Sequence, residues 1–180
     1  MFSMSNLCFG IGILLLLLCF STKISNFLDI RKMFIQHFDI FKGNWIQFIG
    51  IFVSPFFLSI AIVGVKCVDA AIINNLNIVL SILIAMFFSV LSILCTFFDG
   101  KSKTVKYKNL MKETFNSTIF EIIICLFILL VSFITLFRND FTDNNMLKIV
   151  SGIIYYFSIV AVLNILVIIK RVKALFDHFI

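Results

Sequence analysis

Apolar and polar stretches alternate along this chain with a spacing that predicts membrane-spanning helices. Leu76 to Phe98 contains no charged residue in 23 positions, and Thr118 to Phe137 contains only Glu121. At about 1.5 Å of rise per residue, each stretch can cross a hydrocarbon core about 30 Å thick. The expected spans cover about residues 5–21, 45–65, 76–98, 118–137 and 149–169. We therefore predict one transmembrane domain over residues 1–180, an all-α, polytopic, integral membrane helical bundle of about five helices.

The first apolar stretch, residues 5–21, is the shortest of the five. No Lys or Arg precedes it and no A-x-A cleavage pattern follows it, which favours a retained span over a secretory signal peptide. The alternative is a four-span protein in which this stretch lies flat. In the second span, Pro55 is expected to kink the helix, because proline lacks an N–H and releases a backbone carbonyl.

Residues 25–41 have one apolar and one polar face in a helical projection. The apolar face carries Phe27, Ile30, Phe34, Phe38 and Phe41. The opposite face carries Asp29, Lys32, Gln36 and Asp39. Two interpretations stay open: an interfacial amphipathic helix in the plane of the headgroups, or a helix packed against other cytoplasmic parts of the protein.

A lysine-rich segment, predicted as a loop over residues 99–117, fixes the expected orientation. Its lysines are Lys101, Lys103, Lys106, Lys108 and Lys112. Short lysine-rich loops resist translocation, so this segment is expected in the cytoplasm. Five spans then place the amino terminus outside and the carboxyl terminus inside, with 12 Lys and Arg residues inside and 3 outside. The five lysines are candidate contacts for lipid headgroups or for a soluble partner.

The composition excludes a water-soluble globule of this size. The chain is 62% hydrophobic and 13% charged, with a mean hydropathy of +1.15. The net charge of +6 lies in short clusters beside apolar spans, which is typical of membrane topology, so direct nucleic-acid binding is not expected. The five cysteines have no CxxC spacing and predict neither a disulfide framework nor a zinc site.

Small and hydroxyl side chains form stripes on two successive spans. The stripe on the third span carries Ser81, Ala85, Ser89, Ser92 and Thr96. The stripe on the fourth carries Thr118, Glu121, Cys125, Ser132 and Thr135. Such faces allow close helix packing, so we expect the two stripes to pack against one another, and Asn164 to bond a neighbouring helix or specify oligomerisation. The alternative is that the stripes line a narrow pore formed by several copies.

Few residues carry possible chemistry. Glu121 is the only charged residue within a confident span, and it could be a buried functional carboxylate. We favour a Glu121 that snorkels to the interface or pairs with Lys112 or a loop lysine. Neither His37 nor His178 has further ligands at metal-binding spacing, and no phosphate loop, nucleophile elbow or HExxH motif occurs. We expect no catalysis, no cofactor and no metal.

The basic segment KSKTVKYKNLMKETF between spans and the closing IIKRVKALF give the chain its family resemblance. In architecture it resembles the small multi-span membrane subunits of bacterial anti-phage defence systems, the Kiwa membrane subunit being the nearest. That subunit is expected to have four spans rather than five. The resemblance implies a membrane component that senses phage attack and works with a soluble cytoplasmic protein acting on phage DNA functions.

These observations favour a non-enzymatic subunit or effector of the bacterial inner membrane. We expect it to be oligomeric, to contact membrane lipids and to work with a soluble cytoplasmic partner. Two alternatives belong to other classes: a pore-forming or lysis protein, and a bacteriocin-immunity or transport-accessory protein.

Overall fold

Four long apolar segments are helical in the computed structural model, which describes residues 35, 37–38, 44–98, 105–137 and 144–177. The elements are α3 (Trp45–Phe48), η1 (Ile49–Val53, a π-helical turn), α4 (Ser54–Val65), α5 (Ala70–Phe98), α6 (Val105–Phe137) and α7 (Asn144–Asp177). Over these residues the structure contains no strand. The expected first span, 5–21, and most of the amphipathic segment 25–41 lie outside the described residues.

Four stretches of these helices are long and apolar enough to cross a membrane. They are Trp45–Val65, Ala70–Thr96, Tyr107–Phe137 and Asn145–Asp177. The prediction of an all-helical protein is therefore confirmed, and four of the five expected spans have a helix of the required length. The second expected span matches its helix at both ends, whereas the later helices are longer than the apolar stretches that predicted them.

The segment expected as a basic loop is helical over most of its length. Because α6 begins at Val105, the prediction of a loop that reaches residue 117 is wrong. The lysines mark the end of the apolar stretch, but Lys, Glu, Leu and Met are all good helix formers. Tyr107, Met111 and Thr114 are buried in these first turns, so packing also supports the helix.

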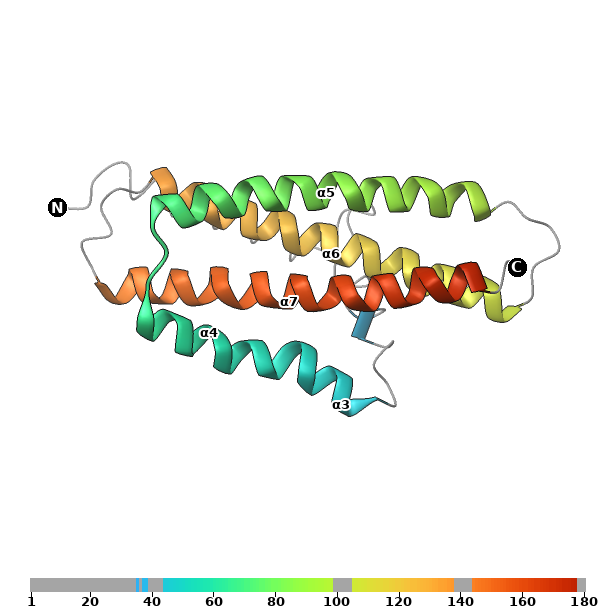
Figure 1. Cartoon of the computed structure of the whole chain (residues 1–180), viewed down its shortest axis with the longest axis horizontal. Coiled ribbons are helices and arrows are strands. Elements are labelled where there is room, and N and C mark those ends of the chain that lie inside the picture. The colour runs from blue at the N-terminus through green and yellow to red at the C-terminus, as the bar shows by residue number, and fades with distance from the viewer. Residues whose placement is uncertain (1–34, 36, 39–43, 99–104, 138–143, 178–180) are drawn as a thin grey trace, which may run out of the picture. The chain divides into compact units, whose positions relative to one another are not determined.

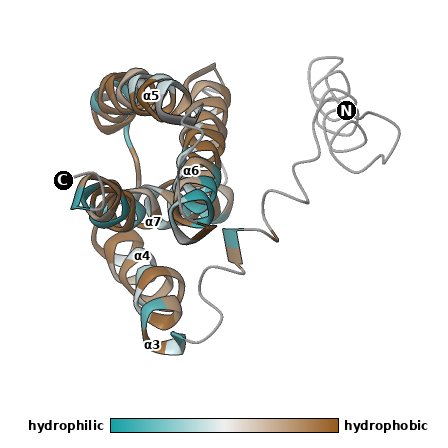
Figure 2. Ribbon diagram, turned by 90° about the vertical axis from the view of Figure 1, so that its right-hand side faces the viewer, coloured by the Kyte–Doolittle hydropathy of each residue, from teal (hydrophilic) through white to brown (hydrophobic). Residues whose placement is uncertain are grey.

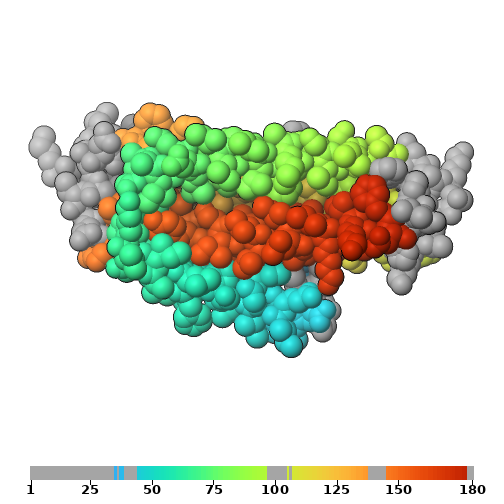
Figure 3. Space-filling model, in the orientation of Figure 1, coloured from blue at the N-terminus to red at the C-terminus, as the bar shows by residue number. Residues whose placement is uncertain are grey.

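Among the described helices, α6 packs against two long helices, α5 and α7. Helix α4 packs against α7. Successive helices run in opposite directions, so the end of α5, the start of α6 and the end of α7 lie at the same end (Figure 1). The helices are predominantly hydrophobic along their length (Figure 2), and on the face shown in Figure 3 α7 lies between α5 and α4. Large apolar side chains such as Phe57 and Phe88 are exposed, which suits a lipid environment.

Residues seven positions apart form the buried surface of each long helix. On α5 they are Ile73, Leu80, Phe87 and Leu94, each at most 5% exposed. On α7 they are Ile154, Ala161, Ile168 and Leu175. On α6 two series run side by side: Tyr107, Thr114, Glu121, Ile128 and Thr135, and Met111, Thr118, Cys125 and Ser132. A seven-residue repeat keeps one face of a helix against its neighbour over many turns, as in coiled coils.

The span 45–65 is irregular just before Pro55, in agreement with the expected effect of proline. The π-helical turn η1 occupies that position, and the carbonyl oxygen of Phe52 within it accepts a hydrogen bond from the Tyr156 hydroxyl of α7 at 3.3 Å. This hydrogen bond gives the irregular turn a polar contact with α7 within an apolar environment. Near the other end of α4, the N–H of Val68 donates to Ser151 Oγ at 3.0 Å. Polar bonds therefore fasten this irregular helix to α7.

Candidate functional site

Polar side chains occupy much of the buried side of α6. The polar seam, as we name it, consists of Thr114, Ser117, Thr118, Glu121, Ser132 and Thr135 of α6 together with Asn164 of α7. All except Thr135 are at most 1% exposed. Helices of membrane proteins associate through such side chains, because an apolar solvent gives no hydrophobic driving force for their packing. The polar seam is therefore a packing surface and the candidate functional site.

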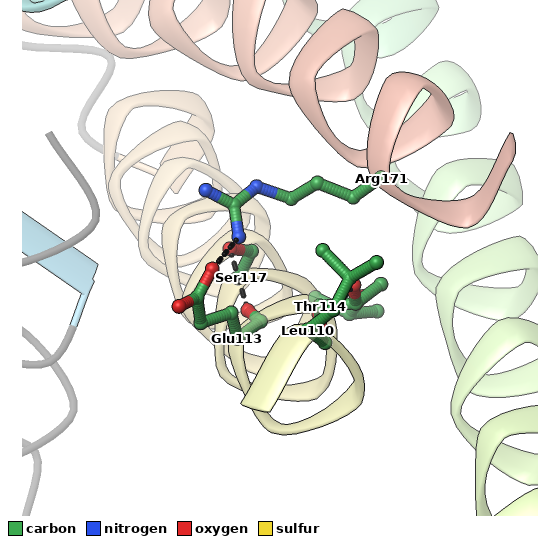
Figure 4. A network of polar contacts seen from close by, with 6 residues as sticks. Leu110, Glu113, Thr114, Ser117 and Arg171 are labelled. Atoms are coloured by element: carbon green, nitrogen blue, oxygen red, sulfur yellow. Dashed lines mark hydrogen bonds and ion pairs between the residues drawn. The ribbon is translucent and has the colours of Figure 1, made fainter. Parts of the chain in front are cut away.

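An ion pair closes one end of the polar seam. Arg171 of α7 reaches across to α6, where its Nη1 donates to Glu113 Oε2 at 2.9 Å (Figure 4). The Arg171 side chain is 15% exposed and that of Glu113 is 48% exposed. Behind the pair, Ser117 Oγ donates to the Glu113 carbonyl at 2.9 Å, and Thr114 Oγ1 donates to the Leu110 carbonyl at 2.8 Å. The half-exposed carboxylate of Glu113 thus lies next to the buried hydroxyls of the polar seam.

Farther along the polar seam, a carboxyl and a carboxamide are buried together. Glu121 is 0% exposed and Asn164 is 1% exposed. The Asn164 carboxamide lies beside the Glu121 carboxyl where α7 packs against α6. Even so, the carboxyl oxygens and both polar amide atoms lack a partner at full hydrogen-bond geometry among the described residues. The pair fits the same antiparallel register as the Glu113–Arg171 ion pair. Glu121 lies eight residues after Glu113 on α6, and Asn164 lies seven residues before Arg171 on α7.

The burial of Glu121 contradicts our expectation that it snorkels to the interface or pairs with Lys112. Lys112 is exposed, whereas Glu121 has no exposed surface. The reason is the face of α6 on which Glu121 lies. It belongs to the buried seven-residue series with Thr114 and Ile128, and the neighbouring helices cover that face.

A histidine that the sequence did not mark as part of any site packs on α6. His37 is 1% exposed, and its ring stacks on Phe120 at 3.9 Å between centroids and 12° between planes. Burial, with a smaller effect of the Arg171 charge, lowers the pKa of His37 to about 3. His37 and Phe38 therefore pack against α6 and η1, while the rest of the segment 25–41 leaves both interpretations open. Phe38 lies beside the stacked rings of His37 and Phe120, and its ring centroid is 5.3 Å from that of Phe52.

The hydroxyl stripe of the third span does not pack against that of the fourth. Its members Ser81, Ser89, Ser92 and Thr96 are all exposed on α5. Three of them donate to carbonyls of their own helix, for example Ser89 Oγ to the Ala85 carbonyl at 3.1 Å. Since α5 uses its seven-residue apolar series to contact α6, the stripe is left facing outward. The packing prediction is therefore wrong for α5, whereas the stripe on α6 is buried.

Basic side chains gather where α6 begins and α7 ends. This basic end consists of Lys108, Lys112, Lys170, Arg171 and Lys173. Lys101 and Lys103 lie outside the described residues, as does the side chain of Lys106. A cavity of about 70 Å³ with apolar walls lies nearby between α5, α6 and α7, bounded by residues such as Leu94, Met111 and Leu175.

Among the residues that the structure describes, fewer basic ones lie at the opposite end of the helices. Lys66 Nζ lies 2.8 Å from Asp69 Oδ2, and Lys148 lies near the start of α7. The ion pair raises the pKa of Lys66 and lowers the pKa of Asp69, mainly through the hydrogen bond between them. Within the described part of the chain, no group of three or more His, Cys, Asp or Glu residues could hold a metal ion.

These features define a helical protein with four helices of membrane-spanning length and a buried polar seam between them. Comparison with known proteins found no matching family model, no similar curated protein and no similar solved structure. The function is therefore inferred from the geometry and charge of the chain itself.

Proposed function

We propose that this chain is a non-enzymatic subunit of the bacterial inner membrane that binds an acidic soluble protein at its basic end. The distribution of charge carries the proposal. Lys108, Lys112, Lys170 and Lys173 are exposed at the basic end, in addition to the paired Arg171. At the opposite end the exposed basic side chains of the described residues are Lys66, which is paired with Asp69, and Lys148.

The same asymmetry supports an orientation with the basic end in the cytoplasm. Lysine and arginine beside spans are retained on the cytoplasmic side. Four crossings from Trp45 to Asp177 return the chain to the side on which it began. A fifth crossing by residues 5–21 would place the amino terminus outside, and the carboxyl terminus stays inside in either topology.

Exposed lysines favour an acidic protein surface as the partner, with anionic lipid headgroups as a further contact. The lysines stand on helical turns that extend beyond the predicted apolar spans, which supports a contact made outside the membrane. The resemblance to small membrane subunits of anti-phage defence systems favours a role in such a system. In that role the soluble partner would act on phage DNA functions.

Charge reversal at the two ends tests this proposal. Lys108→Glu combined with Lys173→Glu should abolish co-purification of the soluble partner from a mild detergent. The matched control, Lys148→Glu at the opposite end, should leave co-purification unchanged. Recovery of the unmodified protein alone as a monomer would contradict the proposal, as would equal losses in both variants.

One observation favours a second candidate function, an oligomeric pore. The stripe of Ser81, Ser89, Ser92 and Thr96 faces away from the other described helices. Copies that turn these faces toward a common axis would line a narrow hydrophilic path. Ion leakage from liposomes containing the pure protein would support a pore. Leakage that is unchanged by Ser89→Leu combined with Ser92→Leu would rule out this lining.

A further inference from the structure

In the Glu121–Asn164 pair the hydrogen-bonding capacity of a carboxyl and a carboxamide is unused, as is that of the Ser132 hydroxyl farther along the polar seam. Four polar atoms, two from the carboxyl and two from the carboxamide, have no partner at hydrogen-bond geometry among the described residues. By contrast, the neighbouring hydroxyls of Thr114, Ser117 and Thr118 each donate to a carbonyl four residues earlier at 2.8–2.9 Å. Buried polar groups left in this way normally interact with one another or with a small ligand.

The surroundings of Glu121 favour its neutral, protonated form. Helices α4 and α5 contain no charged residue. The cationic side chains of α7 closest to Asn164 in sequence are Lys170 and Arg171, about two turns beyond it; Lys170 is exposed and Arg171 is paired with Glu113. On α6 the adjacent titratable group is the buried Cys125, and beside α6 His37 stacks on Phe120. An ionised carboxylate in an apolar interior with no cation in contact is strongly disfavoured.

A protonated carboxyl is also the chemical complement of Asn164. Its O–H can donate to the amide oxygen, and its carbonyl oxygen can accept from the amide nitrogen. An ionised carboxylate offers acceptors alone and would leave the amide oxygen without a donor. Binding of one proton therefore lets each of the four polar atoms of the pair take part in a hydrogen bond.

Hydroxyls of the polar seam lie between this pair and the basic end. Thr118, Ser117 and Thr114 lie on the two turns between Glu121 and Glu113, a distance of about 12 Å along the helix. Each hydroxyl oxygen keeps lone pairs with which to accept a further hydrogen bond. In the other direction, the buried apolar side chain of Ile128 lies between Glu121 and the next hydroxyl of the polar seam, Ser132.

We infer that Glu121 and Asn164 form a site that binds one exchangeable proton, loaded and released from the basic end through the hydroxyls of α6. The inference rests on the membrane insertion proposed above but not on the soluble partner. The site exchanges its proton with the basic end alone, since Ile128 separates it from the opposite end of the helices. It therefore senses the pH on one side and does not conduct protons across the membrane.

The competing explanation is purely structural. A polar pair at seam positions can fix the register of α6 against α7 without exchanging protons. A sealed carboxyl in that role would keep its proton whatever the pH of the surrounding solution. The two explanations differ in whether the Glu121 carboxyl exchanges its proton with the solution on one side of the membrane.

Labelling with a hydrophobic carbodiimide in liposomes tests the inference on the unmodified, pure protein. The reagent reacts with a protonated carboxyl: the carboxyl oxygen bonds to the carbodiimide carbon, the proton moves to a nitrogen, and rearrangement leaves a stable N-acylurea on the side chain. Mass spectrometry of the α6 peptide then shows whether Glu121 is modified. Because no variant is needed for this measurement, impaired folding of a mutant does not affect it.

We expect Glu121 to be labelled at acidic pH, with labelling falling about tenfold per pH unit once the carboxyl ionises. The fall should follow the pH on the basic-end side of the liposome and not the pH on the other side. Thr118→Val should slow the response to a pH jump, whereas Thr96→Val on the exposed stripe of α5 should not.

Three results would overturn the inference. They are absence of label on Glu121, labelling independent of pH on both sides, and protection by sodium at constant pH, which would identify a metal-cation site instead. Since no soluble partner is present, labelling of Glu121 that follows the pH would survive a failure of the partner proposal. Conversely, a partner bound to a protein that shows no labelling would leave the proposed function intact.

Discussion

Two adjacent phenylalanines of α5 allow a matched test of the helix packing. Phe87 is 1% exposed and belongs to the seven-residue series that contacts α6, whereas Phe88 is 56% exposed. In lipid, truncation of a side chain loses little transfer free energy, because both states remain in an apolar solvent. What remains is the cavity, which costs about 24 cal/mol per Å³.

Phe→Ala removes about 100 Å³, so a cavity at position 87 that does not collapse costs about 2.4 kcal/mol. That value lowers the equilibrium constant for helix association about 60-fold. Phe88→Ala opens no cavity and should change the stability by less than about 0.5 kcal/mol.

The assay is the equilibrium unfolding of the purified protein in mixed detergent micelles, followed for wild type and both variants. Phe87→Ala should shift the midpoint to a lower fraction of denaturing detergent, and Phe88→Ala should not. Equal shifts, or a larger shift for Phe88→Ala, would refute the assignment of the α5 surface that packs on α6.

Three further predictions concern polar contacts. The pKa of His37 is lowered from 6.5 to about 3, so the unfolded chain binds a proton that the folded protein does not, and stability should fall as pH drops from 6.5 toward 3. His37→Phe should remove this pH dependence in the same unfolding assay. Arg171→Ala leaves the half-exposed Glu113 without its partner and should cost about 1 kcal/mol or less, with a loss that shrinks in high salt. Tyr156→Phe removes the donor to the Phe52 carbonyl and should cost about 0.6 kcal/mol, measured as a lower unfolding midpoint; no change would show that this bond contributes nothing.

The number and order of the long helices in the described chain could be predicted because uncharged runs of about 20 residues have few alternatives to a span. Their ends could not be predicted in the same way. Hydropathy marks where the apolar stretch ends, but α6 begins at Val105 and α7 continues to Asp177 because charged residues of high helix propensity continue the helix past the apolar stretch.

The buried face of α5 had a signal in the sequence that the hydroxyl stripe obscured. Ile73, Leu80, Phe87 and Leu94 repeat every seven residues, and this series, rather than Ser89 and its neighbours, packs on α6. In an apolar chain a hydroxyl stripe identifies one helix face but not its neighbour. The repeat of large apolar residues identifies the contact more directly.

The polar seam was only partly predictable. The α6 stripe correctly grouped Glu121 with Thr118 and Ser132, but the burial of Glu121 depends on which neighbouring helices cover this face. Its proximity to Asn164 depends on the antiparallel register of α6 and α7, which no spacing within one helix contains. His37 was missed because it was considered only as a possible metal ligand.

The sidedness of the basic end tests the central claim most directly. In a variant whose native cysteines other than Cys67 are replaced, Lys112→Cys adds one thiol at the basic end, and Cys67 lies between α4 and α5 at the opposite end. An impermeant thiol reagent applied to intact cells should label Cys67, and it should label position 112 only after the membrane is opened. Labelling of position 112 in intact cells would contradict the orientation and the assignment of the basic end to the cytoplasm.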